Sequence, residues 1–208
     1  NYGQLGNNTT TNYSSPVQIG TTSTWTSIAC GYYSTAGIQS NGTLWAWGLN
    51  SYGQLGNNTT TNYSSPVQVG ALSTWTAIAS DSSHTLALRA GGTLWAWGYN
   101  VNGQLGNLST TNQSSPIQIG TTLVWSTVGC GYNNSLAAAS NGTLYVWGNN
   151  GNGQLGNNST TNLSSPIVIS SPANASLVSK TLAGGFYHTV VNQSIGFLEY
   201  NSSLKPCM

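Results

Sequence analysis

The chain has 208 residues, of which 38% are hydrophobic, so it is long enough to bury a sizeable core. Three basic and two acidic residues give a net charge of +1, and charged residues make up 2% of the chain, where about 25% is usual. So few cations cannot neutralise phosphates, which excludes nucleic acid as a partner. No apolar run reaches the roughly 18 residues of a membrane helix, which excludes membrane insertion.

A repeat of 50 residues organises the sequence, and its clearest marker is Gly-Gln-Leu-Gly at residues 3–6, 53–56, 103–106 and 153–156. We divide the chain into one propeller domain, or part of one, with units 1–50, 51–100, 101–150 and 151–201 and a tail at 202–208. Residues 2–18 are identical to residues 52–68. Because a repeat array normally begins with an atypical capping unit, this identity predicts a processed chain or a fragment with further repeats upstream.

Within the first unit, a polar loop at 7–15 follows Gly-Gln-Leu-Gly. Residues 16–19 are predicted to form a short strand that begins with Pro16, which suits a strand start or an outer edge because proline lacks the ladder donor. Asn41-Gly42 predicts a tight hairpin in which both turn residues take positive φ. Alternating apolar residues predict three more strands, at 25–30, 34–39 and 43–47.

Four short strands in every 50 residues predict an all-β fold, a β-propeller built of four-stranded antiparallel blades. The four units either form part of a larger ring, which the identical first copy favours, or close alone with residues 197–200 beside the first unit. The fourth unit departs from the others, since 18 positions separate Pro166 from Gly184 where 14 separate Pro116 from Cys130. Its aromatic strand is expected at 196–201.

The motifs at 75–79, 83–88, 92–100 and 102–106 resemble the regulator-of-chromosome-condensation repeat family. The resemblance covers units one to three fully and unit four partly, and it implies a propeller, usually of seven blades. The best-known member of the family catalyses guanine-nucleotide exchange on a small GTPase and sits on chromatin. A regulator that binds a protein partner through one propeller face is therefore the alternative function. It would need charged contacts, yet units one and three contain no charged residue.

The recurring tryptophans suggest either a carbohydrate site or a packed core, and their strict period favours packing against the neighbouring blade. The glycines of the Gly-Gln-Leu-Gly motif are expected to form turns. His84 shares its repeat position with Ser34, Asn134 and His188, and it resembles the structural histidine of the family. The residues expected to build the repeat are Trp45, Trp47, Trp95, Trp97, Trp147, Gly53, Gly56, Gly103, Gly106, Gly153, Gly156, His84 and His188.

Catalytic and metal chemistry find little support in the sequence. Asp81, His84 and nearby serines form no recognisable triad, because a nucleophile, a base and an orienting acid must converge. The histidines, cysteines and acids lack ligand spacing, so we expect no catalytic residue, no metal, no cofactor and no enzyme activity. Cys30 and Cys130 are expected to be buried free thiols rather than a disulfide, and Cys207 in the tail could pair with another chain.

The depletion of charge leaves a surface whose contacts hardly depend on pH or salt, which suits exposure outside the cell. We therefore expect a non-enzymatic structural or recognition module, secreted or on a cell surface, filament or virion. Its partner is expected to be a protein, a glycan or other copies of itself. Asn-x-Ser/Thr sequons supply candidate glycosylation sites in the polar loops and the fourth unit, at Asn8, Asn12, Asn58, Asn62, Asn107, Asn112, Asn158, Asn162 and Asn174.

Overall fold

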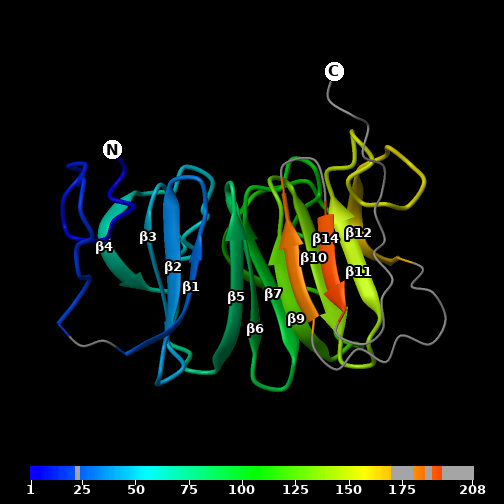
Figure 1. Cartoon of the computed structure of the whole chain (residues 1–208), viewed down its shortest axis with the longest axis horizontal. Coiled ribbons are helices and arrows are strands. Elements are labelled where there is room, and N and C mark those ends of the chain that lie inside the picture. The colour runs from blue at the N-terminus through cyan, green and yellow to red at the C-terminus, as the bar shows by residue number, and fades with distance from the viewer. Residues whose placement is uncertain (22–23, 170–179, 186–188, 194–208) are drawn as a thin grey trace.

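The computed structural model describes residues 1–21, 24–169, 180–185 and 189–193. All the regular secondary structure of these residues is β-strand, and none of them lies in a helix. Figure 1 shows the strands standing side by side in successive sheets. The predicted all-β class with four-stranded antiparallel blades is confirmed. Several sequence predictions lie outside the described residues, namely the strand at 196–201, the tail with Cys207, His188 and Asn174.

Three sheets are complete blades, and each runs from an inner to an outer strand in chain order. The first contains β1 (Trp25–Cys30), β2 (Ser34–Gln39), β3 (Leu44–Gly48) and β4 (Tyr63–Gln68). The second contains β5 (Trp75–Asp81), β6 (His84–Arg89), β7 (Thr93–Gly98) and β8 (Gln113–Gln118). The third contains β9 (Trp125–Cys130), β10 (Asn134–Ala139), β11 (Leu144–Gly148) and β12 (Leu163–Val168), and a hairpin of β13 (Lys180–Gly184) and β14 (Thr189–Gln193) follows it.

Each blade is offset from the sequence repeat, because its outer strand comes from the following unit. In the first blade β4 pairs with β3, so unit two completes the sheet begun in unit one. The outer strands begin three residues before the proline, and Pro66 lies within β4 rather than at its start. As an outer strand, β4 tolerates a proline that donates no hydrogen bond.

The strand predicted at 16–19 does not form. Residues 13–18 are in no strand, although the identical sequence at 63–68 forms β4. The difference is non-local, because β4 lies against β3 and residues 13–18 have no neighbouring strand among the described residues. An outer strand of this composition therefore depends on its partner rather than on its own propensity.

The hairpin at Asn41-Gly42 has a different turn from the one predicted. Gly42 has a φ of 78°, but Asn41 is not among the residues with positive φ. The Gly42 N–H donates to the Gln39 carbonyl at 2.8 Å, and Gln39 N–H donates to the Thr43 carbonyl at 3.0 Å. This pattern is a type I turn followed by one left-handed residue, so only the glycine needs positive φ.

The core lies between blades rather than within one. Leu86 and Leu88 of the second blade pack with Trp125 and Trp147 of the third in one buried cluster. An equivalent cluster joins the first blade to the second through Ile38, Leu44, Trp75 and Trp97. A blade has little thickness of its own, so burial of these side chains between neighbours supplies the hydrophobic stabilisation.

The Gly-Gln-Leu-Gly turn fastens each blade to the next. Leu55 has no exposed surface, and the Gln54 carbonyl accepts hydrogen bonds from Trp97 Nε1 at 3.0 Å and from Thr85 Oγ1 at 3.3 Å. Both donors belong to the second blade, while the turn follows β3 of the first. The turn glycines at 53, 56, 103, 106, 153 and 156 all have positive φ.

Replacing Gly56 by alanine should destabilise the protein more than replacing Gly70. Both glycines have positive φ, at 72° and 64°, so both changes cost about 1–2 kcal/mol in backbone strain. A Cβ atom at residue 56 would lie 2.6 Å from Trp97 Nε1, whereas nothing lies within 4 Å of one at residue 70. We expect Gly56→Ala to lose about 1–3 kcal/mol more in urea unfolding, because the indole must move. Equal losses would show that the turn does not pack tightly on the tryptophan.

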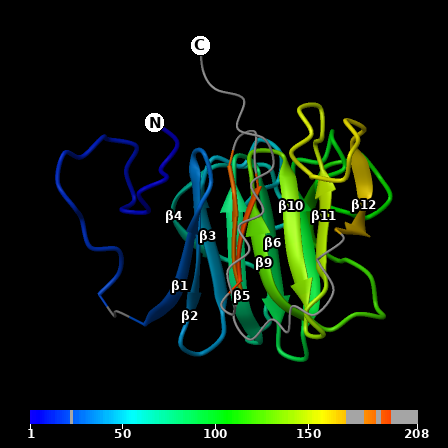
Figure 2. The same cartoon turned by 45° about the vertical axis from the view of Figure 1, so that its right-hand side comes forward.

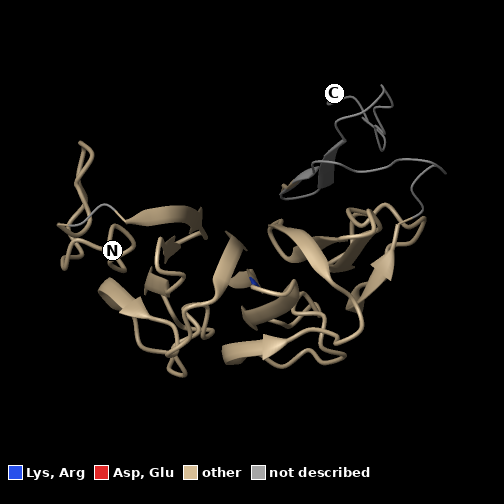
Figure 3. Cartoon of the chain, turned by 90° about the horizontal axis from the view of Figure 1, so that it is seen from below, with Lys and Arg blue, Asp and Glu red and all other residues tan. Residues whose placement is uncertain are grey.

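The blades follow one another in an open arc, which Figure 2 shows from the side and Figure 3 from below. The first blade stands at one end of the described arc, and the β13–β14 hairpin follows the third blade at the other end, where β13 lies next to β9. Cys30 is exposed on β1 at the first end, which contradicts the expected burial, because no strand of the described residues packs on that side of β1. Cys130 is a buried free thiol, as expected, and its Sγ donates to the Ala79 carbonyl of the second blade at 3.4 Å.

Candidate partner-binding surface

The ends of the blades that are uppermost in Figure 1 form one surface, here called the top face. It consists of the turns 31–33, 82–83 and 131–133 and the loops 49–62, 99–112 and 149–162. Each loop is tied to a turn of its own blade by a backbone hydrogen bond, from Leu49 to Tyr33, Tyr99 to Ser83 and Asn149 to Asn133, at 2.8–2.9 Å. The repeat thus places loops of similar sequence side by side.

A buried asparagine holds each of the later polar loops in shape. Asn100 has no exposed surface, and its Nδ2 donates to Asn107 Oδ1, to the Ser109 carbonyl and to the Thr111 carbonyl at 3.0–3.1 Å. Its Oδ1 accepts from the Leu105 N–H at 2.9 Å. Asn50 and Asn150 make the equivalent bonds. The loops are therefore ordered before any partner binds.

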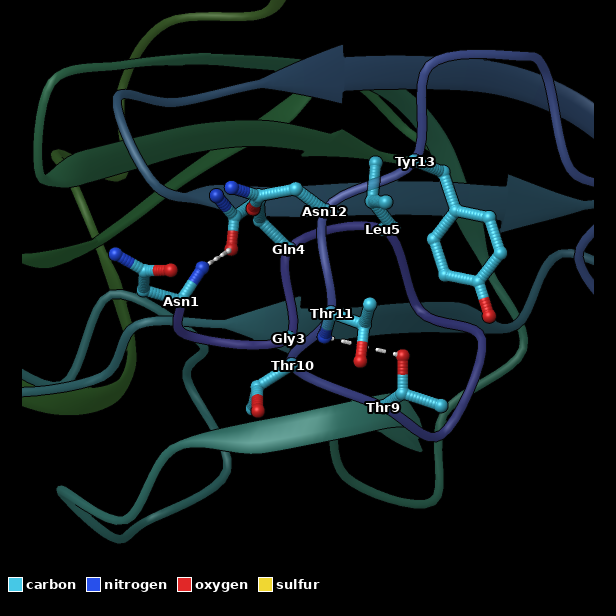
Figure 4. A pocket seen from close by; sticks show the side chains of 9 residues that line it. All are labelled: Asn1, Gly3, Gln4, Leu5, Thr9, Thr10, Thr11, Asn12 and Tyr13. Carbon is cyan, nitrogen blue, oxygen red and sulfur yellow. Dashed lines mark hydrogen bonds between the residues drawn. The ribbon is translucent and has the colours of Figure 1, made fainter.

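The first polar loop surrounds a small open cavity of about 180 Å³, lined by polar and apolar groups and shown in Figure 4. Leu5, Thr9 and Thr11 line it, and Thr11 N–H donates to Thr9 Oγ1 at 3.3 Å. The corresponding groups of the second loop bond the amide of Asn50. The cavity thus lies at the position where the second loop holds the carboxamide of Asn50.

Tyrosine side chains gather on the top face beside the polar loops. Tyr33 packs against Tyr2 and Tyr32, with ring centroids 5.0 Å and 4.3 Å apart, and Tyr52 packs against Tyr99 at 4.8 Å. Tyr32 is 67% exposed. A hydrogen bond to Tyr32 raises the pKa of the Tyr33 hydroxyl above its ordinary value, so this hydroxyl stays neutral at physiological pH.

The top face carries almost no charge. Asp81 lies at the end of β5, half-buried, and burial raises the pKa of its carboxyl despite a hydrogen bond from the Ser82 N–H at 2.6 Å. Arg89 lies at the opposite end of the second blade, where its guanidinium covers the rings of Trp75 and Trp95. In Figure 3 nearly all of the described ribbon is neither acidic nor basic.

The glycosylation candidates occupy the outer parts of these loops. Asn107 is half-buried, and the others within the described residues are exposed, at Asn8, Asn12, Asn58, Asn62, Asn112, Asn158 and Asn162. The candidates differ in whether the side-chain oxygen accepts a hydrogen bond within the loop. The Oδ1 atoms of Asn62, Asn112 and Asn162 accept hydrogen bonds from the backbone of Asn50, Asn100 and Asn150 at 2.8 Å. The side chains of Asn8, Asn58 and Asn158 have no such role, and their residues have positive φ.

Most of the repeat residues that the structure describes are buried, and Gly156 is exposed. Trp47, Trp97 and Trp147 are buried, with each Nε1 donating to a glutamine carbonyl of a Gly-Gln-Leu-Gly turn, whereas Trp45 and Trp95 are half-buried. His84 is fully buried, and its Nε2 lies 2.9 Å from Ser135 Oγ of the third blade. Burial lowers the pKa of His84 to about 4, despite a hydrogen bond to the backbone of Asn134.

The geometry around His84 does not activate a nucleophile. Ser135 Oγ donates to the Gln104 carbonyl at 2.7 Å, so its proton is directed away from the imidazole. Asp81 stands opposite His84 in the β5–β6 ladder, but its carboxylate accepts from Ser82 instead. Within the described ranges no three acidic, histidine or cysteine side chains are close enough to hold a metal ion. No helix in this part of the chain could cross a membrane.

Comparison with family models gives a match along most of the chain. The regulator of chromosome condensation (RCC1) repeat matches residues 1–38, 41–88, 91–138 and 141–191. The chain belongs to the RCC1 repeat family. A second model of the RCC1 repeat matches 25–54, 75–104 and 125–154, which are the first three strands of each complete blade and the first two residues of the Gly-Gln-Leu-Gly turn that follows. No curated protein sequence is similar enough to count as a relative.

Solved RCC1-like structures share the fold at low sequence identity. Human WBSCR16 is 24% identical with a TM-score of 0.79, over 91% of this chain and 50% of its own. Prp20p from Saccharomyces cerevisiae, which binds Gsp1p and histones, is 21% identical with a TM-score of 0.71, over 81% and 43%. Yeast RCC1 bound to Kap60 is 21% identical with a TM-score of 0.67, over 81% and 41%. The chain thus spans half or less of the length of these structures.

Sequence reasoning identified the polar loops but missed the asparagines that hold them and the tyrosine clusters. Asn50, Asn100 and Asn150 follow the Trp-Gly motif at the same position in each unit. This recurrence could have identified them from the sequence. Tyr2 and Tyr52 also recur, but their partners Tyr33 and Tyr99 occupy different positions of the repeat. Only the folded turns bring those rings together.

Proposed function

We propose that the chain is a non-enzymatic recognition module that works outside the cell and binds an uncharged partner through its top face. The observation that carries the proposal is the pairing of exposed tyrosines with asparagine-held polar loops on one surface. Tyrosine supplies large and rigid contact area, and asparagine, serine and glycine supply adaptable hydrogen bonds, as in antibody paratopes. RCC1-like Prp20p binds protein partners, so a protein is the partner class that we favour.

The extracellular location rests on the charge depletion and the exposed sequons. A surface with almost no ionisable groups keeps its contacts across changes of pH and salt. Intact mass of the chain secreted by a eukaryotic host, before and after enzymatic removal of N-glycans, tests this part of the proposal. A mass difference that maps to Asn8, Asn58 or Asn158 supports it. A chain that is retained in the cytosol and unmodified contradicts it.

The alternative is an exchange regulator of a small GTPase, by analogy with RCC1. Such an activity rests on the fold alone, because the structural neighbours are below 25% identical. Among the described residues, the top face offers one half-buried carboxylate and no basic side chain. The structure therefore favours recognition without exchange, and a nucleotide-release assay with a small GTPase should show no acceleration.

The double change Tyr32→Ala and Tyr52→Ala should remove binding to the partner. Truncation of an aromatic hot spot costs about 2 kcal/mol or more, which is roughly a 30-fold loss of affinity. The measurement is binding to panels of secreted proteins, cell-surface ectodomains and neutral glycans. Val124→Ala is the matched control, since Val124 is 54% exposed and lies at the opposite end of the blades.

Three outcomes of the screen are informative. A protein partner lost only with the tyrosine changes supports the proposal. A neutral glycan lost in the same way replaces the favoured partner class with a sugar. A partner that is unaffected by the tyrosine changes, or equally affected by Val124→Ala, contradicts the assignment of the top face.

A further inference from the structure

One leucine of the top face has a backbone conformation that leucine rarely adopts. Leu108 lies in the third polar loop with a φ of 61°, in the left-handed region. Asn58 and Asn158 occupy the corresponding positions of the second and fourth loops, with φ of 61° and 58°. Asparagine tolerates this conformation because its short polar side chain can bond the local backbone, whereas a bulky apolar residue is strained by it. Leu108 therefore carries a strain that its counterparts largely avoid.

Burial within the chain does not offset this strain. Leu108 is 80% exposed, more than any other large apolar residue in the described ranges. Val101 of the same loop is 55% exposed, at a position where the second and fourth loops have serine and glycine. The hydrogen bond from Asn100 Nδ2 to Asn107 Oδ1, at 3.1 Å, brings together the two points of the loop that these apolar residues follow. The third loop thus presents two apolar residues where its neighbours are polar or have no side chain.

The backbone around Leu108 is fixed before any partner binds. Its N–H donates to the Ser164 carbonyl of β12 at 2.8 Å. Both flanking residues bond the buried amide of Asn100, through Asn107 Oδ1 at 3.1 Å and the Ser109 carbonyl at 3.0 Å. An exposed apolar side chain on a rigid backbone loses little conformational freedom when it binds, which is the property of an interface anchor.

We propose that Leu108, with Val101 beside it, is the apolar anchor of the top face and inserts into an apolar pocket of a protein partner. The inference rests on the proposed function and extends its binding surface from the Tyr52–Tyr99 pair to the third loop. A neutral glycan exposes mainly hydroxyl groups and has no apolar pocket for a leucine. A membrane is disfavoured, because even a myristoyl chain gives only marginal membrane binding and these two side chains are far smaller.

Leu108→Asn tests the anchor, because it places the residue of the neighbouring loops at this position. Leu72→Asn is the matched control, since Leu72 is 45% exposed in the loop between β4 and β5, at the opposite end of the blades. Each change creates an Asn-Ser-Thr sequon, so both chains are made in a bacterial host without N-glycosylation. The probes are the panel of secreted proteins, cell-surface ectodomains and neutral glycans, together with phosphatidylcholine vesicles.

We expect Leu108→Asn to weaken binding to a protein of the panel at least about 30-fold, and Leu72→Asn to leave it unchanged. The urea midpoint of Leu108→Asn should equal or exceed that of the wild type, because asparagine relieves the backbone strain. Loss of binding without loss of stability supports the inference. A lower urea midpoint would show that the leucine packs within the protein, which overturns it.

The binding results separate this inference from the proposed function. If Leu108→Asn binds as the wild type does while the tyrosine double variant does not, the anchor is wrong and the top-face proposal stands. If both variants bind fully, or if the wild type binds no probe, both are wrong. Equal losses in Leu108→Asn and Leu72→Asn overturn the anchor. So does wild-type binding only to vesicles or to a glycan, because the partner is then not a protein with an apolar pocket.

Discussion

Asn100→Asp should lower the free energy of unfolding by at least about 3 kcal/mol and open the third polar loop. The asparagine amide donates to three oxygen atoms from a fully buried position. A carboxylate has no proton to donate, so those three acceptors lose their partner, and each buried unsatisfied group costs about 1–3 kcal/mol. The negative charge also faces three oxygens. Urea unfolding at neutral pH measures the loss.

Asn141→Asp is the matched control for that change. Asn141 is exposed in a hairpin, and its Oδ1 accepts from the Thr143 N–H at 3.0 Å. A carboxylate accepts the same bond, so we expect a change within about 0.5 kcal/mol. If both variants unfold at the same urea concentration, the buried amide does not hold the loop. The Asn100 variant should also expose the loop to proteolysis before the blades unfold.

His84 should lower the free energy of unfolding by about 3 kcal/mol as the pH falls from 6.5 to 4. Burial lowers the pKa of the folded imidazole to about 4 from the ordinary value of 6.5. Between these values the unfolded chain binds a proton that the folded chain does not, so acid favours unfolding. The stability is present in full above pH 6.5 and is lost as the pH falls through the folded pKa, at 1.36 kcal/mol for each pH unit.

His84→Asn isolates this effect, because Asn134 occupies the corresponding position of the third blade. The difference in unfolding free energy between wild type and variant should shrink or reverse as the pH falls from 6.5 to 4. Burial raises the pKa of Asp81, which works in the opposite direction, and the difference between the two proteins cancels that contribution. Parallel pH profiles would contradict a buried neutral histidine.

Much of the blade architecture could be predicted because its signals are local. The alternating residues of β1 and β2 and the glycines of the Gly-Gln-Leu-Gly turn each carry their own pattern. The outer strand could not be predicted in this way. Residues 13–18 and 63–68 share one sequence and differ in structure, because among the described residues a strand lies beside the second copy and none beside the first.

The candidate surface was also harder to predict from the sequence, because its contacts join residues that lie apart in the chain. Asn100 bonds groups that lie 7, 9 and 11 positions further along the chain, so its role appears only when the loop folds around it. Cys30 and Cys130 share a repeat position, yet one is exposed and the other buried. Both cysteines end an inner strand, and the neighbouring blade determines which of them is buried.

The most direct test of the proposed function is the salt dependence of partner binding by the top face. A partner from the screen is titrated with wild type and with the tyrosine double variant, at low and at high sodium chloride concentration. We predict an affinity that is nearly independent of salt and that is lost in the double variant, because contacts between neutral groups are not screened. An affinity that falls steeply with salt, or that survives loss of both tyrosines, would contradict recognition by an uncharged top face.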